Sequence, residues 1–341
     1  MNKKRVLAFT MIIFMMASLC GVQVISERKI IITEVTKISA KTTPVEQYGQ
    51  LSVSGTALVG ENGKKFMMKG VSTHGLSWYP QYVDKKGFKN LRDKWKVNTI
   101  RLALYTEEYA GYCSGGDKKR LEELVASGVE MATDLGMYVI VDWHILSDGN
   151  PNTHVKEAKT FFKKMSKKFK KNKNVIYEIC NEPNSGTTWK QIKSYAKKII
   201  PIIRKNSPKA VIVVGTPTWS QDVDVAAKSP IKKYKNLVYS LHFYSGTHKE
   251  DLRKKAKEAL KAKLPILVTE FGITDASGNG SVNKKEANRW IKFLRNNKVG
   301  FCIWNLSNKN ESSALIRSNC KKTNGWSDKN LTAQGKWYKA I

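Results

Sequence analysis

The chain has 341 residues, 41% of them hydrophobic and 10% aromatic, and its formal charge is +32. This length and apolar content exclude a disordered chain and allow one large domain or two ordinary ones. Only ten of the 60 basic residues are arginine, the residue that most often contacts the phosphates and bases of nucleic acids. We therefore expect no nucleic-acid partner. The scattered lysines instead indicate a solvated surface with a loose attraction to an anionic cell wall.

Residues 1–26 have the pattern of a secretory signal peptide. Lys3, Lys4 and Arg5 precede an apolar stretch over residues 6–22, and small residues follow it. An uncleaved membrane anchor is the alternative, because the apolar stretch is at the long end of the range. We predict a secreted monomer without stable membrane insertion once the signal has been cleaved.

Removal of the signal would leave four of the five cysteines: Cys113, Cys180, Cys302 and Cys320. Four cysteines allow two disulfides in an exported protein. Cys180 and Cys302 lie in apolar runs, however, and are equally well interpreted as core residues. No CxxC spacing occurs that would indicate a zinc site.

Residues 27–47 mix charge, threonine and proline without a helical period, which indicates a leader or linker. We therefore place the domain at residues 48–341. Its first segment alternates apolar and polar residues and contains the pair Asn62-Gly63, a pattern that predicts an N-terminal hairpin.

Eight short apolar runs then alternate with amphipathic helical segments. Continuous apolar strands between helices predict a parallel sheet covered on both faces, and eight repeats predict an α/β fold, a single (β/α)8 TIM barrel. The alternative is a doubly wound open sheet, but no Gly-rich phosphate turn follows the first strand. The expected strands are 66–71, 97–104, 137–143, 175–180, 210–215, 237–242, 265–271 and 299–304. The expected helices are 86–95, 118–135, 155–169, 189–204, 249–262, 284–296 and 332–340, with only a short link after the fifth strand.

Polar and aromatic residues follow the apolar residues of every strand. In a TIM barrel these exits converge at one end, where the chemistry takes place. A single histidine or glutamate at a strand end is usually structural, but such residues at all eight exits predict a pocket. In chain order the exits carry His74 with Trp78, Arg101 with Tyr105, His144, Asn181 with Glu182, Trp219, His242 with Tyr244, Glu270, and Trp304.

Two glutamates, on the fourth and seventh strands, define the predicted chemistry of this pocket. A pair of carboxyl groups across a cleft can break a glycosidic bond when one donates a proton and the other attacks the sugar carbon. The acid needs a pKa raised by burial or by a neighbouring charge. Arg101 is the cation available to keep Glu270 ionised, and Tyr244 could donate a hydrogen bond to it. We therefore predict Glu182 as the acid/base and Glu270 as the nucleophile.

The motifs "ICNEPN" and "VTEFG", set among "IRLALY", "VDWH", "SLHFY" and "IWNLSNKNESSAL", closely resemble glycoside hydrolase family five. Within that family the resemblance is to the bacterial endo-β-1,4-glucanases, or cellulases, and it extends from about Val53 to the C-terminus. It implies the same acid/base and nucleophile, no cofactor and no metal. The invariant set of the family would fall on Arg101, His144, Asn181, His242, Tyr244 and Trp304.

The same resemblance implies how a β-1,4-glucan would be bound. Asn181 would hold the sugar 2-hydroxyl, and His74 matches a substrate-binding histidine. The aromatic platforms would be Trp78, Tyr105 and Trp219. Lys309 and Glu311 would bind a hydroxyl on the non-reducing side.

Three alternatives remain beside a secreted retaining endo-β-1,4-glucanase. An endo-β-mannanase or a mixed-linkage β-glucanase of the same family would differ by contacts to single hydroxyls. A non-catalytic polysaccharide-binding barrel is a remote alternative, because both glutamates are present. A metal-dependent barrel hydrolase would need more ligands than "VDWH", the only compact His/Asp unit, supplies.

Overall fold

The computed structural model describes residues 42–341, so the predicted signal peptide and residues 27–41 of the predicted leader lie outside the described residues. The remainder of that leader is not a linker. Pro44–Tyr48 forms helix α2, because Thr43 and Glu46 cap each other's backbone groups and Pro44 occupies the first turn. The folded unit accordingly begins at Thr43 instead of residue 48.

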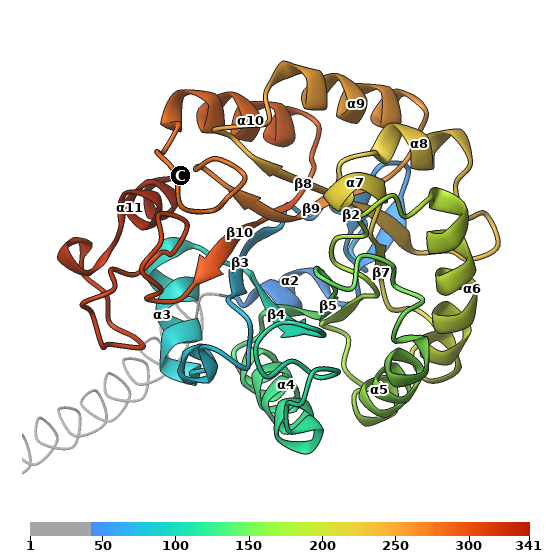
Figure 1. The fold of residues 1–341 in the computed structure, drawn as a ribbon, viewed down its shortest axis with the longest axis horizontal. Helices are drawn as coiled ribbons and strands as arrows, with labels where there is room; N and C mark the ends of the chain where they lie inside the picture. The colour runs from blue at the N-terminus through green and yellow to red at the C-terminus, as the bar shows by residue number, and fades with distance from the viewer. Residues whose placement is uncertain (1–41) are drawn as a thin grey trace, which may run out of the picture. The chain divides into compact units, whose positions relative to one another are not determined.

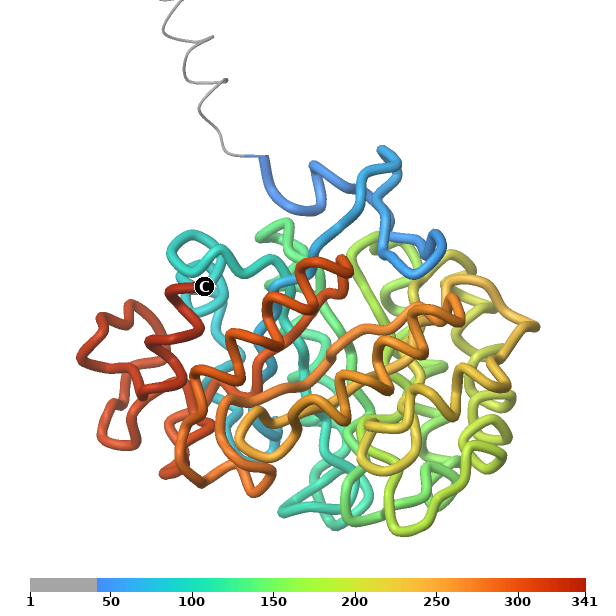
Figure 2. Tube along the Cα trace, turned by 90° about the horizontal axis from the view of Figure 1, so that it is seen from above, coloured from blue at the N-terminus to red at the C-terminus, as the bar shows by residue number. Residues whose placement is uncertain are grey.

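The predicted N-terminal hairpin is present. Strands β1 (Ser52–Ser54) and β2 (Ala57–Val59) pair antiparallel around Gly55, whose φ of +59° suits glycine. The predicted turn at Asn62-Gly63 does not connect β1 to β2 but follows β2. There it reverses the chain so that Val59 forms an antiparallel bridge with Lys65. In Figure 2 this N-terminal segment lies across one end of the barrel.

Eight parallel strands close into a barrel in the order β10-β3-β4-β5-β6-β7-β8-β9, which confirms the predicted TIM barrel (Figure 1). The first strand begins at Lys69, three residues later than predicted, because Phe66 and Met68 lead into the barrel as buried coil. The strands are β3 (Lys69–Thr73), β4 (Thr99–Tyr105), β5 (Tyr138–His144), β6 (Val175–Glu178), β7 (Ile212–Val214), β8 (Leu237–Tyr244), β9 (Ile266–Gly272) and β10 (Phe301–Leu306).

The predicted amphipathic helices surround the barrel, each with an apolar face packed against the strands. They are α3 (Lys85–Trp95), α4 (Lys118–Asp134), α5 (Val155–Lys168), α6 (Trp189–Asn206), α9 (Glu250–Lys261), α10 (Lys284–Asn296) and α11 (Ala333–Ala340). The link after the fifth barrel strand is more structured than predicted. It contains the short helices α7 (Pro217–Ser220) and α8 (Val223–Lys228), too short to show a helical period in the sequence. Two single 3₁₀ turns, η1 (Pro80–Tyr82) and η2 (Asp328–Asn330), complete the ordered elements.

Alternate residues of each strand point into the barrel, and they form two layers. On β5, Ile140 belongs to an apolar cluster, whereas Asp142, the next inward residue, is fully buried among polar groups. We call the apolar cluster near the strand starts the lower layer, and the buried polar cluster above it the upper layer. The lower layer contains Leu51, Leu58, Phe66, Met68, Tyr138, Ile140, Ile176, Val211, Val213, Val238, Leu267 and Cys302. The upper layer contains Ser72, Arg101, Asp142, Glu178, Ser240 and Thr269.

The hairpin packs on the lower layer. Leu51 and Leu58 belong to it, and the hydroxyl of Tyr138 donates a 2.7 Å hydrogen bond to the carbonyl of Gly49. The N-terminal end of the barrel is therefore closed by apolar packing, which leaves the opposite end for the polar strand exits.

The four cysteines of the described residues are all free, so the alternative of two disulfides is wrong for this structure. Cys302 is buried on β10 and Cys180 is buried just after the end of β6, in keeping with their interpretation as core residues. No helix within residues 42–341 combines the length and apolar character that a membrane span requires.

Candidate active site

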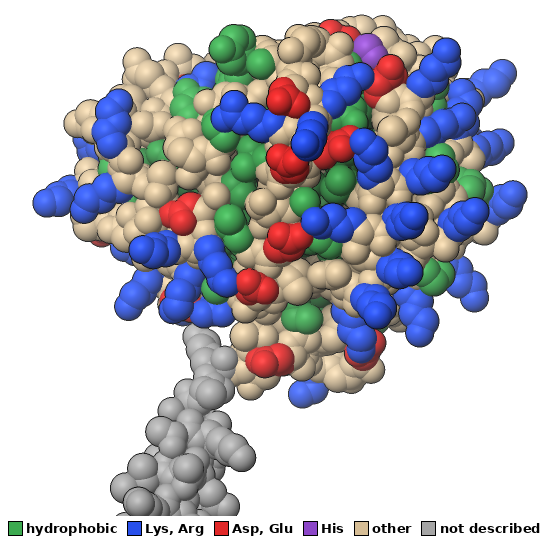
Figure 3. Space-filling view, turned by 90° about the horizontal axis from the view of Figure 1, so that it is seen from below, with side chains coloured by type: hydrophobic (Ala, Val, Ile, Leu, Met, Phe, Trp, Pro, Cys, Tyr) green, Lys and Arg blue, Asp and Glu red, His purple; other side chains and the backbone are tan. Residues whose placement is uncertain are grey.

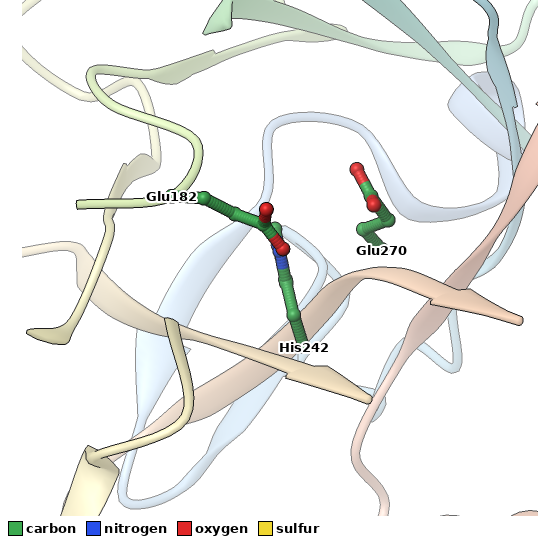
Figure 4. A group of neighbouring side chains, drawn as sticks. All are labelled: Glu182, His242 and Glu270. Carbon is green, nitrogen blue, oxygen red and sulfur yellow. The ribbon is translucent and has the colours of Figure 1, made fainter. Parts of the chain in front are cut away.

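The two predicted glutamates face each other at the carboxyl ends of their strands (Figure 4). Glu182 follows β6 and Glu270 lies on β9, and both side chains are buried. A carboxylate oxygen of each, together with a ring nitrogen of His242, lie within 4.8 Å of one another. Two acidic groups 88 positions apart in the sequence thus share one small site.

Glu270 receives a donor at each of its oxygens. Arg101 Nη1 donates to Oε2 at 3.2 Å, and the hydroxyl of Tyr244 donates to Oε1 at 2.8 Å. The pairing of β8 with β9 shifts register just before Glu270, where His242 aligns with it. Such a bulge re-aims a side chain, and here Thr269 and Glu270, although consecutive, both contact groups inside the barrel.

Arg101 is fully buried at the centre of the upper layer. Its Nε donates to Glu178 at 2.7 Å, and its Nη2 lies 3.0 Å from a carboxylate oxygen of Asp142. Burial alone would lower the pKa of Arg101, but the carboxylates of Asp142, Glu178 and Glu270 reverse this effect and raise the pKa well above its ordinary value. The guanidinium is therefore a permanent cation that three acidic groups share.

The two glutamates have different partners, and this separates their protonation. Burial raises the pKa of Glu182 to about 8, against a smaller opposing effect of Arg101. Burial, then the charge of Glu182, also raise the pKa of Glu270, while His242 and Arg101 oppose the shift. Only Glu270 has a direct contact with a cation. When the pair holds one proton, Glu182 is therefore the residue that carries it.

His144 and Asn181 form a second set of fixed contacts. His144 Nδ1 lies 2.6 Å from Asp142 Oδ2, and Asn181 Nδ2 lies 3.2 Å from His144 Nε2. Asn181 Oδ1 accepts from Arg101 Nη2 at 2.6 Å, and its Nδ2 also donates to the carbonyl of Ile145 at 3.0 Å. Burial lowers the pKa of His144 to about 3, so the ring is neutral near neutral pH.

His74 is neutral for the same reason. Burial lowers its pKa to about 3, and the backbone N–H of Gly75 donates to its Nδ1 at 2.7 Å. Its Nε2 must then carry the hydrogen. A Cβ at residue 75 would lie 2.1 Å from the ring of Tyr105. The absence of a side chain on Gly75 therefore lets the rings of His74 and Tyr105 approach each other.

The cleft above the glutamate pair has a volume of about 610 Å³. Trp304 lies beside His144 with ring centres 5.1 Å apart and an interplanar angle of 18°, and Trp78 stacks on His74 at 5.0 Å. Lys309 and Glu311 form an ion pair of 2.7 Å on the same rim as Trp78, because Lys309 Nζ lies 5.1 Å from the centre of that ring. Aromatic surfaces and charged hydrogen-bonding groups therefore line one continuous groove.

Trp219 stands on a strained segment at the other rim. Residues 218–220 have φ values of 58°, 53° and 55°, a left-handed run that costs roughly 1–2 kcal/mol per residue. Contacts with the neighbouring exit hold it: Trp219 N–H donates to Pro183 O at 3.0 Å, and Ser220 Oγ donates to Asn181 O at 2.6 Å. The side chain of Trp219 remains 45% exposed, so the strained backbone segment presents an aromatic face to the cleft instead of burying it.

The model of the family "Cellulase (glycosyl hydrolase family 5)" matches residues 59–310. The chain belongs to glycosyl hydrolase family 5. It is 44% identical over 296 residues to Endoglucanase A of Butyrivibrio fibrisolvens, covering 86% of this chain and 68% of that protein. It is 48% identical over 292 residues to an endoglucanase of Clostridium saccharobutylicum, covering 85% of this chain and 64% of that protein.

Solved structures of the family have the same fold. Cellulase Cel5C_n superimposes with a TM-score of 0.84 at 41% identity, over 88% of this chain and 94% of that one. The catalytic domain of Thermobifida fusca endoglucanase Cel5A, solved in complex with cellotetraose, gives 0.83 at 36% identity, over 87% and 98%. The chain therefore aligns with nearly the whole of these catalytic domains, but with only about two thirds of the curated relatives' length.

The family 5 barrel brings twelve of the fourteen predicted site residues to the cleft lining. Arg101 and Asn181 are the other two. Both are fully buried beneath the lining and bonded to the residues around them, so a direct contact of either with substrate stays a prediction. The twelve are His74, Trp78, Tyr105, His144, Glu182, Trp219, His242, Tyr244, Glu270, Trp304, Lys309 and Glu311.

The sequence interpretation missed the groups that hold the pair in place. Asp142 and Glu178 flank Arg101, and Thr269 connects Glu178 to His242. Their one available signal was a charged or hydroxyl residue inside an otherwise apolar strand. Nine further residues of the cleft lining were also missed, among them Glu108, Gln221 and His248.

Glu182, His242 and Glu270 are the one group within the described residues close enough to act together as metal ligands. The surroundings disfavour that use. Arg101 already contacts Glu270, and a second cation beside the guanidinium would be repelled. His242 Nδ1 and Glu182 Oε1 are also bonded to each other at 2.9 Å.

Proposed function

We propose that this family 5 protein is a secreted, retaining endo-β-1,4-glucanase that cleaves internal bonds of cellulose and related β-glucans. Glu182 is the general acid/base and Glu270 is the nucleophile. The observation that carries the proposal is the facing glutamate pair, in which one member keeps a proton and the other contacts a cation. The cleavage needs no metal or cofactor, because the two carboxyl groups supply both the proton and the nucleophile.

The reaction proceeds in two steps. Ionised Glu270 attacks the anomeric carbon while Glu182 gives its proton to the departing glycosidic oxygen, which leaves a glycosyl ester on Glu270. Glu182, now a carboxylate, then removes a proton from a water molecule that attacks the same carbon and releases Glu270. The two displacements occur at the same carbon from opposite faces of the sugar and each inverts it, so the product retains the original configuration.

The spacing of the pair supports retention. Retaining enzymes hold the two carboxyl groups about 5–5.5 Å apart, whereas inverting enzymes separate them by about 6.5–9.5 Å to admit a water molecule. One oxygen of Glu182 and one of Glu270 within 4.8 Å of each other fit the shorter spacing better than the longer one.

The roles are tested with conservative variants. Glu182→Gln and Glu270→Gln should each reduce hydrolysis of carboxymethylcellulose at least about 10³-fold, because each removes the proton donor or the attacking oxygen. Both variants should keep the wild-type unfolding temperature to within a few degrees. Near wild-type turnover in either variant would refute the assignment.

Azide separates the two roles. Added to Glu270→Gly, azide should restore cleavage of an activated substrate and give a glycosyl azide of inverted configuration, because it takes the place of the missing carboxylate. With Glu182→Gly, the covalent intermediate on Glu270 should instead yield an azide of retained configuration. The same azide product from both variants would contradict the division of roles.

The cleft chemistry favours an unbranched glucan. Each ring of a β-1,4-glucan presents apolar C–H faces, which the indoles of Trp78, Trp219 and Trp304 can cover, while Lys309 and Glu311 bind hydroxyls. Release of reducing ends should be fastest from β-1,4-glucans in a panel that includes mannan and barley β-glucan. Faster release from mannan would identify a mannanase, and binding without any release would identify a non-catalytic barrel.

Export and loose wall association rest on the signal-like residues 1–26 and on the charge of +32. Lysine and arginine side chains extend over most of the face shown in Figure 3. Electrostatic adhesion is screened by salt, so binding of the monomeric domain to isolated anionic cell walls should fall sharply between 0.01 and about 0.15 M salt. Binding that is independent of salt, or a chain that stays inside the cell, would oppose this part of the proposal.

A further inference from the structure

One chain of buried hydrogen bonds joins the partners of Glu182 to those of Glu270 beneath the cleft. His242 Nδ1 contacts Glu182 at 2.9 Å, and its Nε2 contacts the hydroxyl of Thr269 at 2.9 Å. Thr269 donates to Glu178 Oε1 at 2.6 Å, and Glu178 Oε2 accepts from Arg101, which in turn reaches the second glutamate of the pair. The proposed mechanism uses the two ends of this chain and leaves its middle unexplained.

The ion pair at one end determines the direction of the hydrogen bonds in the middle. Burial raises the pKa of Glu178, but the guanidinium of Arg101 at 2.7 Å opposes that shift and favours the carboxylate. A carboxylate can only accept hydrogen bonds. The single hydrogen of the Thr269 hydroxyl therefore points to Glu178.

Both other neighbours of Thr269 must then donate to it. Ser240 Oγ lies 2.6 Å from the hydroxyl oxygen, and His242 Nε2 lies 2.9 Å from it. The threonine oxygen has two lone pairs to receive these donors. His242 therefore carries its hydrogen on Nε2.

The tautomer of His242 determines the state of Glu182. Burial lowers the pKa of His242 to about 4, so the ring is neutral near pH 7 and has a single N–H. With that hydrogen on Nε2, Nδ1 presents a lone pair to Glu182 Oε1 at 2.9 Å. A hydrogen bond of that length needs a hydrogen, and only the carboxylic acid form of Glu182 can supply it.

We propose that Thr269, oriented by Glu178, is a positioning residue that fixes the Nε2–H tautomer of His242 and thereby keeps Glu182 protonated, ready to donate its proton to the leaving oxygen. This inference rests on the proposed function, in which Glu182 is the general acid. It also serves the second step, because ionised Glu182 then faces a lone pair of His242 and is a stronger base toward water.

Other charged and titratable groups also face Glu182 and His242. They come from several strands: Arg101 and Tyr105 from β4, Asp142 and His144 from β5, Glu178 from β6, Tyr244 from β8, and Glu270 from β9. Replacement of the Thr269 hydroxyl leaves all of them in place. A change in the protonation of Glu182 in such a variant is then attributable to the hydroxyl.

The test compares the pH dependence of kcat/KM on cellopentaose for wild type, Thr269→Val and Thr269→Ser. Valine keeps the shape and removes the hydroxyl, so the alkaline limb should move to lower pH by about one unit. Serine restores the hydroxyl and should restore the wild-type limb. Ser240→Ala is the matched control, because it removes the other 2.6 Å contact of Thr269 without touching His242, and its alkaline limb should stay in place.

A substrate that needs no acid sharpens the test. In an aryl cellobioside with a dinitrophenolate leaving group, that group departs without needing a proton. Thr269→Val should therefore reduce kcat/KM for this substrate far less than kcat/KM for cellopentaose. If Thr269→Val lowers kcat/KM equally for both substrates and leaves the alkaline limb in place, the role of Thr269 is merely structural and the proposal is overturned.

The tautomer can also be observed directly in wild-type protein, without any variant of Thr269. Imidazole ¹⁵N shifts of His242, assigned by their loss in His242→Gln, should show a protonated Nε2 and an unprotonated Nδ1 at pH 6. A protonated Nδ1 would overturn the proposal. This measurement does not depend on turnover, so a wild type that fails to cleave cellopentaose refutes the proposed function alone.

Discussion

The lower and upper layers of the barrel interior are built from the same strands, yet they carry opposite chemistry. On β6, Ile176 packs among apolar side chains, and Glu178, two residues later, is an equally buried carboxylate. The lower layer gains stability from the removal of apolar surface from water. The upper layer has to satisfy every charge by direct contact, because buried charges without partners are strongly destabilising.

The difference between the layers indicates how the site is kept ready for reaction. The lower layer, closed by the hairpin, fixes where the strands end. The upper layer then orients the glutamate pair, through Arg101 directly and through Thr269 by way of His242, and all three residues are buried and hydrogen-bonded. Stability and preorganisation are therefore assigned to separate parts of one core, and substitutions should separate them.

Arg101→Met should have the largest effect of any single change. It leaves Asp142, Glu178 and Glu270 without their shared cation, so the free energy of unfolding should fall by about 3–5 kcal/mol. Activity on carboxymethylcellulose should be lost, because the nucleophile is no longer held as a carboxylate. Urea denaturation and reducing-end assays measure the two effects.

Arg253→Met is the matched control for that variant. Arg253 is also buried and pairs with Glu286 and Glu250, but it lies on α9, outside the barrel. Its loss should reduce stability while kcat stays near the wild-type value. Equal loss of activity in both variants would mean that the upper layer serves stability alone.

Leu58→Ala perturbs the lower layer at the hairpin. A buried leucine truncated to alanine typically costs about 2–5 kcal/mol in the free energy of unfolding. Because Leu58 lies at the closed end of the barrel, kcat measured well below the unfolding temperature should not change. Leu58→Met, which preserves volume, should cost less than about 1.5 kcal/mol. A clear fall in kcat for the alanine variant would show that the two layers are coupled.

The contrast between layers also explains what the sequence could predict. Eight apolar runs and the residues at their exits are local patterns, and they predicted the barrel and both glutamates. Asp142 and Glu178 were missed because their significance comes from Arg101, which is 41 and 77 positions away. Thr269 was missed because its partners, Glu178 and His242, lie on other strands and are brought to it only by the closure of the barrel.

Local strain was equally hidden in the sequence. The left-handed residues 218–220 contain no glycine, so nothing in the amino-acid sequence indicates their conformation. It depends on contacts with Pro183 and Asn181 on the preceding exit. Helix α7, which contains this segment, and helix α8 after it were missed for a different reason, because both are too short to show a helical period.

The raised pKa of Glu182 predicts a pH effect on stability that the lower layer cannot have. Between about 4.5, the value for an exposed glutamate, and about 8, the folded protein holds a proton that the unfolded chain has lost. Stability should therefore decrease as pH rises through this window, by at most about 1.4 kcal/mol per pH unit from this group. Glu182→Gln removes the titration, so its unfolding free energy should fall less between pH 5 and pH 8. An equally steep decline in the variant would assign the effect to other groups.

Trp219→Ala should have the smallest effect, because it touches neither layer. Its exposed indole contributes little to folding, and the unfolding temperature should change by no more than about 2–4 °C. The loss of one aromatic face for a sugar ring should reduce kcat/KM on cellohexaose by about tenfold, through KM more than kcat. Tyr234→Ala, an aromatic substitution just before β8 at the closed end of the barrel, is the control and should leave KM unchanged. If Trp219→Ala instead reduced kcat with KM unaltered, the indole would act on the glutamate pair through the Pro183 and Asn181 contacts, and the rim would be part of the upper layer's network.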